Sequence, residues 1–124
     1  MPETIVRMLK ALSEKNRLRV FYVLRRAETP LCVCELVDIL KESQYNVSRY
    51  VKTLKYAGLL DEKKRGKWVY YSISDAQDDE IKSIKKLVSG LDESEFSGDL
   101  LRMKKRLAMR EKGVCIIGLS PDPV

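Results

Sequence analysis

Residues 32–58 read CVCELVDILKESQYNVSRYVKTLKYAG, and they contain the signature of two helices joined by a tight turn. The apolar spacing predicts a short helix from about Cys32 to Leu40, followed by a turn at Glu42-Ser43-Gln44. A second helix is predicted from about Gln44 to Ala57, and Gly58 suits its end. Its core-facing residues recur at helical spacing and are Val47, Val51 and Leu54. This pattern is that of a helix-turn-helix.

The flanking sequence extends this motif into a larger fold. Apolar stripes predict helices over residues 3–12 and 15–27. After Gly58, two runs around Arg65-Gly66-Lys67 predict a β-hairpin, because the second run is aromatic and β-branched. A helix-turn-helix followed by such a hairpin is a winged helix. Since Tyr70 and Tyr71 alternate faces, one is expected on the core and the other near DNA or solvent.

The rest of the chain is predicted to be helical, with helices from about Asp75 to Val88 and from Ser97 to Lys112. The fold class is therefore mainly α with a small β-hairpin, a winged helix-turn-helix. Residues 1–90 are predicted to form the DNA-binding and dimerisation domain. The role of the helix and tail in residues 91–124 is left open.

Composition narrows the class of protein. The 124 residues include three cysteines and no histidine. This excludes histidine-based general-base catalysis and imidazole zinc sites, and no phosphate loop or paired-carboxylate motif is evident, so an enzyme is not expected. No signal peptide and no run of about 20 apolar residues is apparent, which predicts a cytoplasmic protein without membrane contact and with reduced thiols.

The charge distribution favours a nucleic-acid partner. The net charge is +6, and residues 41–67 contain eight basic and three acidic residues. The start of the second helix is expected to contact base edges in the major groove, with tyrosine on a thymine methyl or a phosphate and lysines on phosphates. The candidate DNA-contacting residues are Ser43, Gln44, Tyr45, Asn46, Ser48, Arg49, Lys52, Lys64, Arg65 and Lys67.

Cys32 and Cys34 form a pair of soft donors directly ahead of this motif. The candidate ions are As(III), Sb(III), Cd(II), Pb(II), Cu(I) and Zn(II). On a regular helix, residues i and i+2 point about 200° apart, so ion binding is expected to require an unwound helix start. Cys115 is the candidate third ligand, with an ordinary buried cysteine as the alternative for that residue.

Several blocks resemble the ArsR/SmtB metal-responsive repressors: residues 11–19, Leu31-Cys32-Val33-Cys34-Glu35-Leu36, residues 43–59 and Gly66-Lys67-Trp68-Val69-Tyr70-Tyr71. The Cys-Val-Cys run is similar to the arsenic-sensing branch. The resemblance implies a homodimer formed by the first helix and the helix of residues 75–88. It also implies an apo form that binds operator DNA and leaves it when an ion binds. Two positions depart from the family pattern: Val37 replaces a third cysteine, and Tyr50 replaces a frequent histidine.

The function predicted from these observations is a repressor of a palindromic operator, released by As(III) or Sb(III). One alternative is a sensor of Cd(II), Pb(II), Zn(II) or thiol redox state on the same scaffold. Another is a winged-helix module for protein contact, with inert cysteines.

Overall fold

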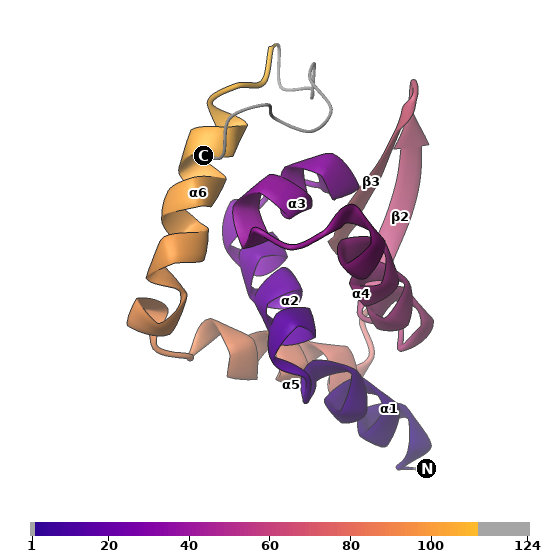
Figure 1. Ribbon diagram of the computed structural model, residues 1–124. Coiled ribbons are helices and arrows are strands. Elements are labelled where there is room, and N and C mark those ends of the chain that lie inside the picture. Colours follow the sequence, from indigo (N-terminus) through magenta and orange to yellow (C-terminus); the bar gives the residue numbers. More distant parts are fainter. Residues whose placement is uncertain (1, 112–124) are drawn as a thin grey trace.

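The computed structural model describes residues 2–111 (Figure 1). Its elements follow the predicted order, with helices, a three-stranded sheet and one 3-10 turn. They are α1 (Glu3–Leu12), α2 (Lys15–Ala27), β1 (Leu31–Cys32), α3 (Val33–Leu40), α4 (Gln44–Tyr56), β2 (Leu60–Arg65), β3 (Trp68–Ile73), α5 (Asp79–Ser89), η1 (Glu93–Phe96) and α6 (Ser97–Leu107). None of the helices in this range is long and apolar enough to cross a membrane.

The core is built around α2, which lies in the middle of the molecule (Figure 1). Five consecutive residues of this helix, numbers 20–24, are buried, because α4, α5, α6 and β3 cover it from several sides. The predicted core face of α4 is confirmed, since Val47, Val51 and Leu54 are fully buried. The helix-turn-helix prediction is thus confirmed by α3 and α4.

The sheet contains one strand more than the predicted hairpin. Its order is β1-β3-β2, with both pairs antiparallel and Cys32 opposite Tyr70. The predicted helix from about Cys32 to Leu40 is confirmed to within one residue, and Cys32 itself has extended backbone angles (φ −86°, ψ 165°) and pairs with β3. The helix α3 begins at Val33.

The expectation that one of the two wing tyrosines faces DNA or solvent is wrong. Tyr70 and Tyr71 are both buried, with 3% and 5% exposure. Tyr71 packs in the main core, where burial and the adjacent Glu62 raise its pKa to about 12. Tyr70 faces the other way and is covered by Cys32 and by Arg110. Both faces of β3 are therefore packed.

The predicted start of the helix after the wing is also too early. Residues 74–78 are neither helix nor strand, the Ser74 hydroxyl accepts a hydrogen bond from the Ala76 amide, and α5 begins at Asp79. The last described helix ends at Leu107, so the predicted continuation to Lys112 is not borne out up to residue 111.

The basic helix α6 turns its arginines inward, against α3. The Arg102 Nε donates to the Ile39 carbonyl at 2.6 Å, and the Arg106 Nε donates to the Asp38 carboxylate at 2.7 Å. Arg106 is fully buried. Leu100 and Met103 of the same helix belong to the main core. The α6 helix therefore holds α3 in place through one buried ion pair, a hydrogen bond to its backbone and apolar contacts.

Candidate functional site

The two cysteines lie at the junction between β1 and α3. Cys32 is the N-cap of α3, and Cys34 follows in its first turn. Their sulfur atoms are 2.8 Å apart, and both residues are thiols. This arrangement agrees with the expectation that the sulfurs can face one ion only where the helix start is unwound: Cys32 is already outside the helix, and the strand-to-helix transition brings both sulfurs together.

Glu35 completes the start of α3. Its side chain is fully buried, and Oε1 accepts hydrogen bonds from the Cys32 amide at 3.1 Å and the Cys32 sulfur at 3.5 Å. This arrangement is a capping box with cysteine in the usual serine position. The hydrogen bond with Cys34, burial and the Glu35 charge together raise the pKa of Cys32, so this side chain is a protonated thiol at neutral pH.

Arg110, which follows the end of α6, also lies at the start of α3, where it contacts Glu35. Its Nε and Nη2 each donate to a different Glu35 oxygen at 2.7 Å, and Nη2 also donates to the Pro30 carbonyl at 2.6 Å. The hydrogen bonds to Glu35 raise the pKa of Arg110. The role of Glu35 as a buried cap and counter-ion, and the presence of Arg110 at this site, were not predicted from the sequence. A glutamate three positions after an N-cap could have indicated Glu35, whereas nothing local indicated Arg110.

The wing forms the other wall of this site. Cys32 and Tyr70 are buried together, with Cys34 and Trp68 partly buried beside them. Within residues 2–111, no three potential metal-ligating side chains come together. Val37, at the position of the family's third cysteine, packs against the core. The predicted third ligand, Cys115, lies outside the described residues, so the structure contributes two sulfurs.

Most of the candidate DNA-contacting residues lie at the start of α4 and along one of its sides. The Ser43 hydroxyl accepts the Asn46 amide at 3.1 Å, so it caps the helix. Tyr45 is 70% exposed, and the Arg49 guanidinium lies over its ring at 5.6 Å. Among the other candidates, Gln44 and Lys52 are exposed, while Asn46 and Ser48 are half-buried.

Tyr50, which replaces the family's frequent histidine, points away from this surface. Its hydroxyl donates to the Glu42 carboxylate at 3.0 Å and accepts from the Asn16 amide at 3.0 Å. Burial is the main cause that raises the pKa of Tyr50. Tyr50 thus fastens α4 to α2 and to the turn of the motif.

The wing tip carries the remaining predicted contacts. Lys64, Arg65 and Lys67 are exposed around Gly66, whose φ of +61° suits a glycine in a hairpin turn. Arg65 lies 5.8 Å from the centre of the Tyr70 ring, which Arg110 contacts at 5.7 Å. The basic wing and the cysteine pair therefore share one aromatic side chain.

Comparison with known proteins identifies the family. The model of the bacterial regulatory proteins of the arsR family matches residues 14–62. The arsenic resistance transcriptional regulator ArsR1 of Pseudomonas putida is 33% identical, and the alignment covers 77% of this chain and 74% of that protein. The chain belongs to the ArsR family. The family and these relatives are transcription regulators, not enzymes.

Other similar proteins are a regulator named for cadmium resistance and a protein of known structure. A cadmium resistance regulatory protein, a CadC homologue of Staphylococcus aureus, is 38% identical, and the alignment spans 60% of this chain and 60% of that protein. The solved structure of HlyU from Vibrio cholerae has a TM-score of 0.60 and 29% identity, covering 69% of this chain and 88% of that one. The winged-helix prediction is confirmed by this similarity together with the three-stranded sheet.

Proposed function

We propose that this ArsR-family regulator is a homodimeric repressor that binds a palindromic operator and leaves it when As(III) or Sb(III) binds Cys32 and Cys34. The observation that carries the proposal is the 2.8 Å separation of the two sulfurs at the start of α3. Soft donors held together in this way suit a thiophilic ion. A third ligand from Cys115, the partner protomer or the solvent completes the preferred set of three sulfurs or two sulfurs and an oxygen.

The exposed residues of α4 and the wing support operator binding. Gln44 and Arg49 can form bidentate hydrogen bonds with adenine and guanine, respectively. Lys64, Arg65 and Lys67 lie at the tip of the hairpin, where they can contact phosphates.

The pairing of β1 with β3 connects the cysteine pair to the wing, which is part of the proposed DNA-binding surface. Cys32 is opposite Tyr70, and Tyr70 lies in the strand that forms the wing. An ion that moves the two sulfurs displaces β1 against β3, and hence shifts the wing relative to α4. The difference in ion affinity between the two states sets the coupling, typically about 1–3 kcal/mol.

The experiment that tests this function begins by selecting bound sequences from a randomised duplex library with the wild-type protein. Fluorescence anisotropy on the selected duplex then measures release by arsenite, antimonite, cadmium, lead and zinc. We expect a palindromic sequence and release by arsenite or antimonite. Failure to select any sequence would contradict a DNA-binding role, and release by cadmium but not by the metalloids would contradict the proposed effector.

The dimer is expected to form through the exposed apolar residues of α1 and α5. Val6, Leu9 and Leu87 are 43%, 46% and 58% exposed, respectively. Leu9→Glu is expected to give a monomer, since it places a charge in a buried contact. Sedimentation velocity measures this effect. Leu101→Glu on α6, at a leucine of similar exposure (56%), is the matched control and should remain dimeric. A dimeric Leu9→Glu protein would contradict this interface.

The proton balance of binding distinguishes cadmium from arsenite. Because the pKa of Cys32 is raised, its thiol must lose a proton to bind Cd²⁺, and cadmium affinity should rise with pH. Each proton released increases affinity about tenfold per pH unit. Arsenous acid instead exchanges hydroxyl groups for thiolates and releases water, so its affinity should stay nearly constant between pH 6 and 8. Isothermal titration calorimetry in buffers of different ionisation enthalpy measures the protons released, and equal release for both ions would contradict this account.

A further inference from the structure

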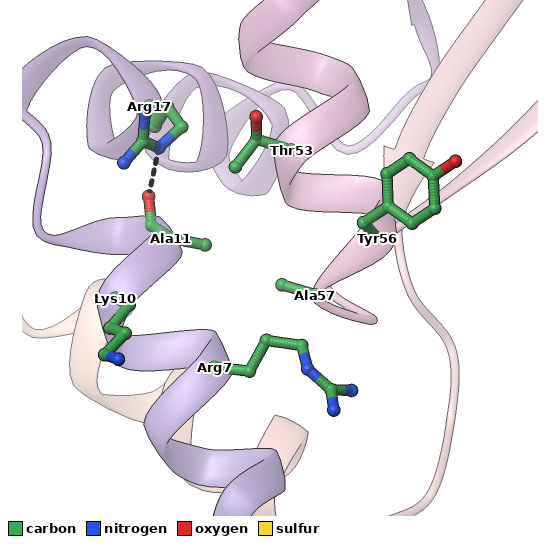
Figure 2. Close-up of a pocket in the computed structure, with 7 residues that line it drawn as sticks. All are labelled: Arg7, Lys10, Ala11, Arg17, Thr53, Tyr56 and Ala57. Carbon is green, nitrogen blue, oxygen red and sulfur yellow. Dashed lines mark hydrogen bonds between the residues drawn. The ribbon is translucent and has the colours of Figure 1, made fainter.

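A shallow cavity lies between the end of α4 and the first two helices (Figure 2). Its volume is 380 Å³, and it is separate from the cysteine pair and from the start of α4. In the close-up, Arg7 extends from α1 below Ala57, while Thr53 and Tyr56 project from α4. The lining residues are Arg7, Lys10, Ala11, Arg17, Thr53, Tyr56 and Ala57.

The rim of this cavity is cationic, and its lining contains no carboxylate. Arg7, Lys10 and Arg17 contribute three positive charges, and none of the ion pairs among residues 2–111 involves them. The Arg17 Nε donates to the Ala11 carbonyl at 2.7 Å, which orients the guanidinium at the rim. The arrangement therefore favours an anion.

The cavity also continues the exposed side of α4. Tyr45, Arg49, Lys52 and Tyr56 follow one another at intervals of three or four residues, so they share one side of the helix. Tyr56, at the cavity, is 85% exposed. It lies about 16 Å along the helix from Tyr45, a length that corresponds to roughly five base pairs of DNA.

From this continuity and charge we infer that the cavity binds a backbone phosphate of operator DNA beyond the bases contacted by the start of α4. Arg7 and Lys10 would neutralise the phosphate, and the Thr53 hydroxyl would donate to one of its oxygens. The methyl groups of Ala11 and Ala57 form an apolar floor for the adjacent deoxyribose. This inference rests on the proposed operator binding and adds α1 to the DNA-binding surface.

The same helix can take part in the dimer. Val6 and Leu9 are centred about 100° around α1 from Arg7 and Lys10. The apolar side can therefore face a second protomer while the basic side faces DNA.

The test uses the double variant Arg7→Ala plus Lys10→Ala and measures affinity as a function of salt concentration. We expect operator and random DNA to lose about tenfold in affinity alike, and the slope of log K against log salt to become shallower by about 1–2. Lys104→Ala plus Lys105→Ala removes the same charge from exposed positions of α6, on the other side of the molecule from the wing (Figure 1). An equal change in this control, or no change in the cavity variant, would overturn the inference.

A second measurement locates the contact on the DNA. Methylphosphonates, which are uncharged, replace single phosphates flanking each half-site of the selected operator. At the phosphate that the cavity contacts, we expect the methylphosphonate to weaken binding by the wild type. The same methylphosphonate should cause no further loss of affinity in the cavity variant. Additive losses at every position would overturn the inference even if operator binding holds. The wing variant Lys64→Ala plus Arg65→Ala tests the proposed function separately, because its loss of affinity does not depend on the cavity.

Discussion

Replacing both Cys32 and Cys34 by serine is expected to abolish release by arsenite while leaving operator affinity close to that of the wild type. Loss of outer partners of an ion typically weakens affinity by about 10–100-fold, so loss of two ligands should exceed about a hundredfold. Anisotropy titrations with arsenite on the protein–operator complex measure this effect. Unchanged release in the double variant would contradict the site.

The structure makes serine a well-matched replacement at the first position. Cys32 is the N-cap of α3, and serine is among the preferred residues there, so the double variant should keep the start of the helix. A loss of release would then report on the sulfur chemistry rather than on folding. Cys115→Ser, tested alone, measures the contribution of the predicted third ligand: full release in that variant would contradict a ligand role for Cys115.

Replacing Glu35 by alanine is expected to lower the free energy of unfolding by about 3–5 kcal/mol. The substitution removes the carboxylate that accepts two hydrogen bonds from Arg110 and caps the Cys32 amide. It leaves a buried guanidinium without its counter-ion. Urea unfolding followed by circular dichroism measures the change, which is large relative to the total stability of a domain.

The matched control for this prediction is Glu93→Ala. Glu93 also pairs with a basic residue, Arg26, but both side chains are substantially exposed. Exposed ion pairs contribute about 0–1 kcal/mol, so this variant should be nearly as stable as the wild type. If both variants lost the same free energy of unfolding, burial of the Glu35–Arg110 pair would not increase its contribution to stability, and the prediction would be contradicted.

The predictable parts of this protein were those with a local pattern. The spacing of Val47, Val51 and Leu54 indicated α4 and its buried side. The neighbouring cysteines do lie together in the structure, whereas a soft ion bound to them stays a prediction. The strand β1 escaped prediction because two residues, Leu31 and Cys32, carry no periodicity. Its pairing with β3 depends on the folded molecule.

The inward orientation of the arginines on α6 could not be predicted for a related reason. A run of basic residues in a helix usually indicates a solvated side. Here Arg106 is buried, and its partner Asp38 is 68 residues away in the sequence. A similar separation, 75 residues between Glu35 and Arg110, kept Arg110 out of the predicted site. The late start of α5 depends on the local hydrogen bond at Ser74, which competes with an earlier helix start.

The ion pair between Glu35 and Arg110 joins positions 75 residues apart, and so it closes most of the chain into one loop. This loop contains α4 and the wing, and the pair fixes both of its ends beside the cysteine site. The Cys32 amide, bonded to the same carboxylate, should therefore exchange its hydrogen with solvent only when the whole domain opens. The cysteine pair and the core are then parts of one cooperative unit.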